Sequence, residues 1–229
     1  MLFKNTNTKK SQQDELKIKV ARAATEYIQS GMGLAIGTGS TVNFFIDELA
    51  KIRHKPDFIV SSSVKTTEYL IKRHFKVVDI SYTSNIDLYI DGADEANYCK
   101  KLIKGGGGAL TGEKICRVIS NQFICMIDES KLVKKLGSFP IAVEVIPQSR
   151  RHVTYSLIKL GGKPIYREDF VTDNGNIILD VHQMDITDPV ARESEINQIV
   201  GVVSNGIFAI YPADILLIAK NSGLINIVR

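Results

Sequence analysis

Glu113 is a candidate acid/base residue in the glycine-rich segment KGGGGALTGEK, residues 104–114. Four consecutive glycines cost backbone entropy, so they usually serve a need such as close approach of a ligand. The segment nearly matches a nucleoside-triphosphate loop, but Glu113 and Lys114 stand where that loop requires Lys and Ser or Thr. A carboxylate here predicts a proton-transferring group at the start of a helix, and Lys104 adds a cation. The alternative is that Glu113 only interacts favourably with the helix dipole.

A second polar segment, DGADE at residues 91–95, directly follows the apolar run at residues 86–90. The carboxyl ends of strands line the ligand crevice in open α/β sheets. Asp91 and Asp94 could therefore accept hydrogen bonds from sugar hydroxyls or bind a divalent metal. The alternative is an acidic solvated turn with local hydrogen bonds.

Two further segments predict anion binding. GTGST at residues 37–41 lies between a predicted strand and a predicted helix, where amides and hydroxyls suit a phosphate. A dinucleotide fingerprint would need a third glycine where Val42 stands, so NAD is disfavoured. DESK at residues 128–131 offers Lys131 to an anion, although a solvated lysine is the alternative. The candidate anion donors are Thr38, Ser40, Thr41 and Lys131.

Taken together, these segments supply anion donors, hydroxyl acceptors, a second cation and a carboxylate base. That combination fits a small phosphorylated polyol that undergoes proton transfer. Each segment alone would be weak support, because each has an ordinary structural explanation.

Composition narrows the function classes. The chain has 229 residues and a net charge of +4, which is too small and too scattered to indicate nucleic-acid binding. The apolar run at residues 215–219 is far shorter than the roughly 20 residues of a membrane span, and no secretory signal is expected. Three cysteines at irregular spacing and four histidines without an HxxxH pair predict neither disulfides nor a zinc site. A cytoplasmic protein with reduced thiols is expected.

The apolar pattern alternates between strands and helices over the first part of the chain. This order predicts an α/β fold, Rossmann-like, with a mostly parallel sheet and helices on both faces. Strands are expected at 33–36, 58–60, 76–78, 86–90 and 123–127. Helices are expected from Leu16 to Tyr27, through Phe44 to Leu49, at 64–74 and at 113–120.

The pattern changes near Gly137. Strands at 141–146, 163–168, 177–181 and 201–205 with helices at 149–160 and 188–198 give the β-α-β-β-α-β order of a ferredoxin-like α+β domain. Apolar strands at 207–210 and 215–218 are expected to return to the first sheet. The small domain, residues 138–206, would then be inserted into a catalytic domain of residues 1–137 and 207–229.

At these residues the sequence resembles ribose-5-phosphate isomerases of the A type. The matching motifs are GTGST at 37–41, SSS followed by Thr67 and Glu68, DGADE at 91–95, KGGGGALTGEK at 104–114 and DESK at 128–131. Later runs also resemble the family: IAVEVIP at 141–147, LGGKPIYR at 160–167 and VTDNGNIILDVH at 171–182. Gly112 and Ala96 stand where the family more often has larger residues. The resemblance extends over nearly the whole chain.

The resemblance implies interconversion of ribose 5-phosphate and ribulose 5-phosphate in the pentose phosphate pathway. It implies that Glu113 moves a proton between C2 and C1, and that Asp91, Asp94 and Lys104 act on ring opening and the sugar oxygens. It implies a phosphate site that includes Lys17. The implied substrate-binding residues are Lys17, Thr38, Gly39, Ser40, Thr41, Asp91, Gly92, Ala93, Asp94, Lys104, Gly105, Gly106, Gly107 and Lys131. No metal or organic cofactor, a cytoplasmic location and a homodimer are also implied.

Three competing interpretations remain at this stage. An amino-sugar phosphate deaminase or a CoA transferase could share the fold, but the deaminases open their sugar with a histidine. A sugar-phosphate-sensing regulator would need no Glu113 and would usually carry a helix-turn-helix, for which the N-terminal segment is too short. A metal-dependent isomerase could use Asp91 and Asp94, and chelation would distinguish it.

Overall fold

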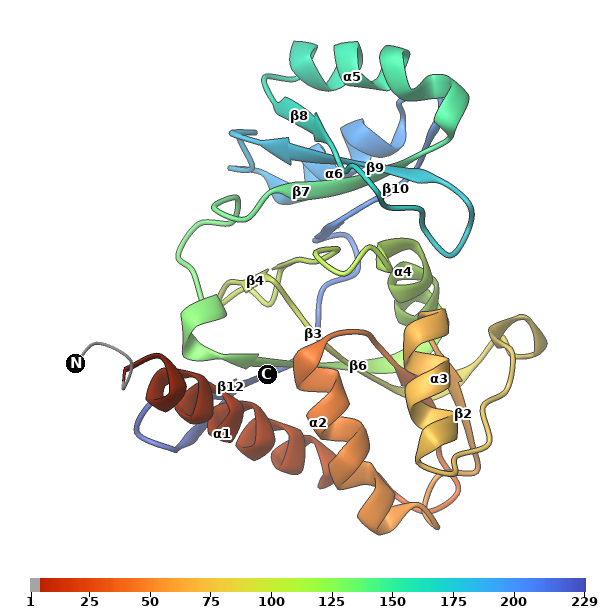
Figure 1. Ribbon diagram of the computed structural model, residues 1–229, viewed down its shortest axis with the longest axis vertical. Coiled ribbons are helices and arrows are strands. Elements are labelled where there is room, and N and C mark those ends of the chain that lie inside the picture. The colour runs from red at the N-terminus through yellow and green to blue at the C-terminus, as the bar shows by residue number, and fades with distance from the viewer. Residues whose placement is uncertain (1–4) are drawn as a thin grey trace.

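The large part of the molecule is built on a six-stranded sheet with the order β13-β12-β6-β3-β1-β2 (Figure 1). The computed structural model describes residues 5–229, and side chains from residue 12 onward. The strands are β1 (Gly33–Ile36), β2 (Phe58–Ser61), β3 (Ile86–Gly92), β6 (Ser120–Asp128), β12 (Ile215–Ala219) and β13 (Ile225–Val228). All neighbours pair in parallel except β12 and β13, which are antiparallel. The predicted mostly parallel α/β fold is confirmed.

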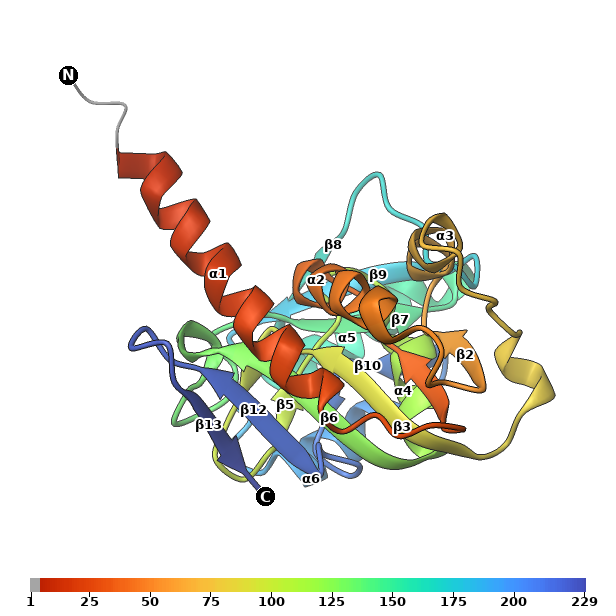
Figure 2. The ribbon, with the colours of Figure 1, turned by 90° about the horizontal axis from the view of Figure 1, so that it is seen from below.

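Both faces of this sheet are buried, because alternate residues of each strand point to opposite sides. Leu34 and Ile36 pack into the core beneath α1 (Asn5–Thr25), α2 (Ser40–Leu49) and α3 (Val64–Lys72). Figure 2 shows α1 and α2 lying across this face. Ala35, between the two, belongs to the core on the opposite face. That face is covered by α4 (Leu110–Val118) and a small sheet of β4 (Glu95–Ala96), β5 (Leu102–Ile103) and β11 (Ile207–Phe208).

A second, four-stranded sheet lies beyond α4, at the top of Figure 1. Its order is β10-β7-β9-β8, and every neighbouring pair is antiparallel. The elements are β7 (Ile141–Val145), α5 (Arg150–Lys159), β8 (Lys163–Tyr166), β9 (Ile177–His182), α6 (Pro189–Asn197) and β10 (Val202–Asn205). The β-α-β-β-α-β order is therefore as expected, and a smaller antiparallel domain is present. The boundaries 138–206, and 1–137 with 207–229, stay a prediction.

Four short 3₁₀ helices lie between the described elements: η1 (Ala50–Ile52), η2 (Ile80–Tyr82), η3 (Glu129–Lys131) and η4 (Pro147–Ser149). No helix among residues 5–229 is both long and apolar enough to cross a membrane.

Two predicted strands differ from the structure. Residues 76–78 form no strand, and only one parallel bridge joins Val77 to Ile59. The strand expected at 207–210 is the two-residue β11, which pairs with β5 and does not return to the large sheet. The expectation for 215–218 is confirmed, since β12 pairs with β6. Two-residue strands such as β4 and β5 were not predicted, because two residues show no periodicity.

Candidate active site

A cleft of about 210 Å³ opens at the carboxyl ends of β1, β3 and β6. This is the edge where the crevice of an open parallel sheet is expected. It brings together segments far apart in sequence, and fourteen of its lining residues were predicted. These are Lys17, Thr38, Gly39, Ser40, Thr41, Gly92, Ala93, Asp94, Lys104, Gly105, Gly106, Gly107, Lys131 and the candidate base Glu113. Asp91 alone among the predicted site residues is not on the cleft wall.

At one end of the cleft, the Lys104 ammonium lies between two carboxylates. Its Nζ is 2.7 Å from Asp91 Oδ2, 2.5 Å from the Gly92 carbonyl oxygen and 3.3 Å from Glu113 Oε2. Lys104 is only 2% exposed. Burial alone would lower the pKa of Lys104, but the Asp91 and Glu113 charges outweigh it and raise that pKa. Lys104 therefore stays protonated as a fixed cation at the cleft wall.

Asp91 is fully buried behind Lys104 and is held on every side. Its Oδ1 accepts from the backbone N–H groups of Thr38 (3.1 Å) and Gly92 (2.7 Å), and its Oδ2 accepts from the Tyr89 hydroxyl. Gly37 makes room for it, because a Cβ there would lie 1.8 Å from Asp91 Cγ. Asp91 is thus placed to hold Lys104 in position. Lys104 lines the cleft, and Asp91 does not.

Glu113 lies in the first turn of α4, which is sandwiched between the two sheets and contacts β6, β7 and β10. The side chain is 4% exposed, yet Glu113 is part of the cleft wall. Its Oε2 is within ion-pair distance of Lys104 but accepts no hydrogen bond from the described residues. Burial raises the pKa of Glu113 to about 8, with Lys104 opposing the rise and Asp91 and Asp94 adding to it. A buried carboxylate with one unsatisfied oxygen, titrating near neutrality, suits general acid/base work.

Asp94 is a second carboxylate that lines the cleft at this end, together with Glu113. Its Oδ2 accepts from the Gly106 N–H at 2.8 Å, which ties the acidic segment to the glycine-rich loop. A Cβ on Gly106 would lie 2.9 Å from Asp94 Oδ1, so only glycine allows this approach without a shift. The two segments predicted to share a site therefore form one wall of the cleft.

The other end of the cleft is formed by the start of α2. Gly39 precedes the helix with φ +133°, and no side chain caps the first turn. Ser40 and Thr41 follow in that turn, so the helix N-terminus is open to an anion. Lys17 and Lys131 also line this cleft. Among the side chains of residues 12–229, the ion-pair partner of Lys17 is Asp14, with Nζ 3.7 Å from Oδ1.

Thr38 lies between the two ends, and its polar groups are already engaged. Its hydroxyl is within hydrogen-bond distance of Ser62 Oγ (2.9 Å), Ser63 Oγ (2.7 Å) and Thr66 Oγ1 (3.0 Å), while its N–H donates to Asp91. Ser63 also caps α3 through the Thr66 N–H. Thr38 thus joins β1 to the start of α3, and its backbone position shapes the cleft.

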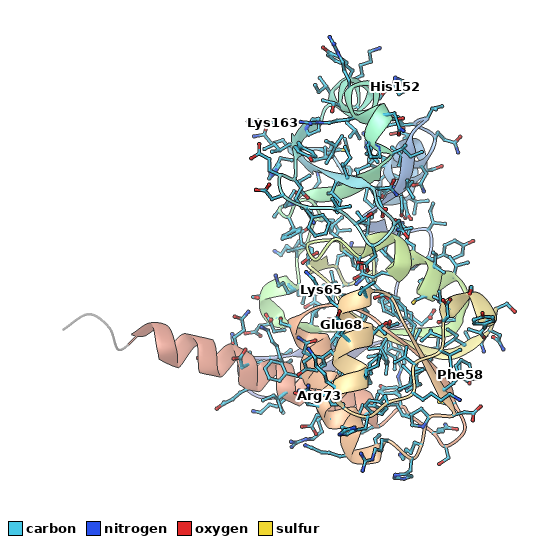
Figure 3. The ribbon with its side chains drawn as sticks, turned by 45° about the vertical axis from the view of Figure 1, so that its right-hand side comes forward. Phe58, Lys65, Glu68, Arg73, His152 and Lys163 are labelled. Carbon is cyan, nitrogen blue, oxygen red and sulfur yellow. The ribbon has the colours of Figure 1, made fainter. Side chains whose placement is uncertain are left out.

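Some lining residues were not among the predicted site residues: Gln13, Val42, Met126, Ile127 and Asp128. Met126, Ile127 and Asp128 end β6, and the position of Asp128 before Lys131 was the available signal. None of the four histidines lines the cleft. His152 lies on α5 in the small domain, far from the large sheet in Figure 3. Within residues 12–229 no group of three or more His, Cys, Asp or Glu side chains could hold a metal ion.

Fold and cleft together define an α/β protein with an uncapped helix N-terminus at one end of a crevice and a buried carboxylate–ammonium pair at the other. A family model described as ribose 5-phosphate isomerase A (phosphoriboisomerase A) matches residues 58–223. The chain belongs to this family.

Relatives support the same assignment over nearly the full length. Ribose-5-phosphate isomerase A of Francisella tularensis subsp. novicida is 53% identical over 218 residues, 95% of this chain and 97% of that one. The protein of the same name from Legionella pneumophila is 54% identical over 213 residues, 93% of this chain and 99% of that one.

Solved structures show that the fold is shared as well. Ribose 5-phosphate isomerase A from Neisseria gonorrhoeae superposes with a TM-score of 0.92 at 44% identity, covering 94% of this chain and 96% of that chain. A D-ribose-5-phosphate isomerase in complex with phospho-erythronic acid has a TM-score of 0.89 at 35% identity, covering 94% of this chain and 98% of that one.

Proposed function

We propose that this protein interconverts D-ribose 5-phosphate and D-ribulose 5-phosphate, with Glu113 as the base. The observation that carries the proposal is the Glu113 carboxylate on the cleft wall, buried, with one oxygen free of hydrogen bonds and Lys104 3.3 Å away. Family membership and the printed names of the relatives favour the same reaction.

The distribution of charged and polar groups along the cleft supports one orientation of the substrate. The phosphate binds at the open N-terminus of α2, with Lys17 and Lys131 supplying charge. The aldehyde end then reaches Lys104 and Glu113. Asp94 and the glycine-loop amides border the same end, where they interact with the sugar oxygens.

The reaction moves one carbon-bound proton. Glu113 removes the proton from C2, and the electron pair of that C–H bond forms the C1=C2 bond of an enediolate. The negative charge develops on the C1 oxygen, beside the Lys104 ammonium. Glu113 returns the proton to C1, and transfer of the hydroxyl proton from O2 to O1 gives the ketose. A preorganised donor at the enediolate oxygen contributes about 3–4 kcal/mol to such a step. Asp91 keeps Lys104 charged and in place.

The same proposal includes the properties that the resemblance implies. The enzyme works without a metal or an organic cofactor, in the cytoplasm, as a homodimer, and its partners are the two sugar phosphates and not nucleic acid. Turnover in the presence of EDTA tests metal independence and would exclude a divalent ion held by Asp91 and Asp94. Sedimentation of the full chain tests the dimer.

The deciding experiment measures ribose 5-phosphate turnover with EDTA for wild type, Glu113→Gln and the control Glu26→Gln. Glu26 is exposed after α1, outside the cleft. Activity in wild type and the control, with loss of most of kcat in Glu113→Gln, is expected, while the variant still binds the sugar phosphate. Turnover of Glu113→Gln close to wild type would refute the base. An inactive wild type that the sugar phosphate still stabilises against unfolding would favour a sensor.

A further inference from the structure

One side chain of the small domain, Arg167, hydrogen-bonds to the backbone of the glycine-rich loop. Arg167 directly follows β8, and its guanidinium extends to the backbone of the loop across the boundary between the two sheets. Nη2 donates to the Gly105 carbonyl oxygen at 3.2 Å, and Nη1 lies 3.3 Å from the carbonyl oxygens of both Gly105 and Gly106. Arg167 itself does not line the cleft.

The adjacent edge of the guanidinium, formed by Nε and Nη2, is fixed by Asp180 on β9. Nε is 2.8 Å from Asp180 Oδ2, and Nη2 is 2.5 Å from Asp180 Oδ1. A two-point carboxylate contact of this kind sets the plane of the guanidinium as well as its position. Both side chains are mostly buried, so the pair is less screened by water than a surface ion pair. The edge that faces the loop is therefore held in one orientation.

This contact sets the direction of the loop amides because each peptide unit is planar. The Gly105 carbonyl and the Gly106 N–H belong to one peptide unit, and they point in opposite directions. Arg167 binds the carbonyl of that unit, and Asp94 accepts from its N–H at 2.8 Å. The Gly106 carbonyl is also held by Arg167, so the N–H of Gly107 in the same unit points away from the small domain. Gly107 lines the cleft.

Glycines would not hold this geometry unaided. Gly105 and Gly108 have positive φ values of +106° and +78°, and four consecutive glycines have many alternative conformations in solution. Phe170, in the same hairpin loop as Arg167, covers Gly108, where a Cβ would lie 2.1 Å from the ring. The hairpin between β8 and β9 thus holds the loop at two points.

We propose that Arg167 is a positioning residue for the isomerisation, which orients the Gly105–Gly107 peptide units so that their N–H groups serve Asp94 and the sugar oxygens. This inference rests on the proposed function, because it assigns the loop amides to the enediolate end of the substrate. Arg167 acts through the loop and does not touch the substrate.

The test compares Arg167→Met, Arg167→Lys and Asp180→Asn with wild type and with Arg192→Met. Arg192 is the matched control, since it also lies in the small domain and pairs with Glu195 without reaching the loop. We expect kcat to fall about 10- to 100-fold in Arg167→Met, as for displaced catalytic donors. The kcat values of Arg167→Lys and Asp180→Asn should lie between those of wild type and Arg167→Met, because both variants keep part of the contact between residue 167 and the loop carbonyls.

Two binding measurements distinguish a positioning role of Arg167 from a general loss of active-site structure. Phospho-erythronic acid has a planar carboxylate at the reacting end, so its affinity should fall about tenfold in Arg167→Met. Inhibition by inorganic phosphate and the KM for ribose 5-phosphate should change less than about threefold, because the phosphate end is untouched. Thermal unfolding of each variant reports on folding.

A kcat of Arg167→Met within twofold of wild type would overturn the inference. An equal loss in Arg192→Met would overturn it too, since the effect would then belong to the small domain as a whole. If Arg167→Met does not fold, wild-type kcat in folded Arg167→Lys and Asp180→Asn would overturn it. An inactive wild type would instead refute the proposed function, and with it the positioning role of Arg167 in the isomerisation.

Discussion

The two ends of the cleft are built in different ways. At the glycine-loop end, Asp91, Lys104 and Glu113 are nearly fully buried and contact one another directly. At the α2 end, Lys17 and Lys131 are half-buried, and the helix N-terminus has no side-chain cap. At the first end the charges pair with one another, whereas at the second the helix N-terminus has no side-chain partner among the described residues.

This difference follows from what each end must do. Charges in a low-dielectric site interact strongly, and they stabilise a developing charge best when already fixed. A phosphate brings its own charge from water, so half-buried lysines and free backbone amides suffice to bind it. We therefore expect substitutions at the glycine-loop end to lower kcat, and substitutions at the α2 end to raise KM.

Lys104→Met should show the largest effect after loss of the base itself. In the proposed mechanism it removes the cation beside the enediolate oxygen, and it leaves Asp91 buried without its ion pair. We expect kcat to fall at least about 100-fold and the free energy of unfolding to fall by about 3–5 kcal/mol. Turnover and urea unfolding measure the two, with Lys101→Met as the control from the same segment. A loss of kcat below tenfold would contradict the role of Lys104.

The change of kcat/KM with pH is the next largest expected effect. A base must be deprotonated, and the pKa of Glu113 is raised to about 8, so kcat/KM should rise up to tenfold per pH unit below about pH 8 and level off above it. The raised pKa means that the folded protein binds more protons than the unfolded chain between about pH 4.5 and pH 8. Stability should therefore decrease as pH rises through that range.

Rate profiles between pH 6.5 and pH 9 and urea unfolding of wild type and Glu113→Gln check both statements. The variant should lose this component of the stability slope, because glutamine does not titrate. A kcat/KM that stays constant between pH 6.5 and pH 9 would mean that the pKa of Glu113 is not raised in solution.

The lysines of the α2 end should have a moderate effect of the opposite kind. Lys17→Met and Lys131→Met should each raise KM about tenfold and leave kcat within about twofold. In the proposed orientation of the substrate, each variant removes one positive charge that binds the phosphate and none that acts on the reacting carbons. The effect should shrink as salt is added. Lys134→Met, an exposed lysine beside η3, is the control. A fall in kcat larger than the rise in KM would remove the distinction between the two ends.

The location of the site could be predicted from sequence because its segments are continuous. Glycines and acids follow directly on apolar runs, and parallel strands bring their carboxyl ends to one edge. The strands β1, β3 and β6 show this pattern clearly. The short β4 and β5 do not, and residues 76–78 have a strand-like composition but only a single bridge to β2.

The different roles of neighbouring residues could not be predicted in the same way. Asp91 and Asp94 are three residues apart and looked equivalent as hydroxyl acceptors. Asp91 ends up buried against Lys104 and Tyr89, whereas Asp94 lines the cleft. Arg167 gave no signal beyond its place in a family-like run, since its partners at residues 105, 106 and 180 are brought near only by the tertiary fold.

Tyr89→Phe should have the smallest effect. It tests whether the hydroxyl behind Asp91 is needed to hold Asp91 and Lys104 in position. The Tyr89 hydroxyl donates to Asp91 Oδ2, and its ring stacks on Phe123 with centroids 4.4 Å apart. Phenylalanine keeps the stacking and removes one of the donors to Asp91, while Lys104 and two backbone amides remain. We expect the free energy of unfolding to fall by about 1–2 kcal/mol and kcat to fall a few-fold, with the exposed Tyr82→Phe as control. A loss of kcat as large as that of Lys104→Met would show that the Tyr89 hydroxyl sets the position of Lys104 and that the backbone donors to Asp91 do not suffice.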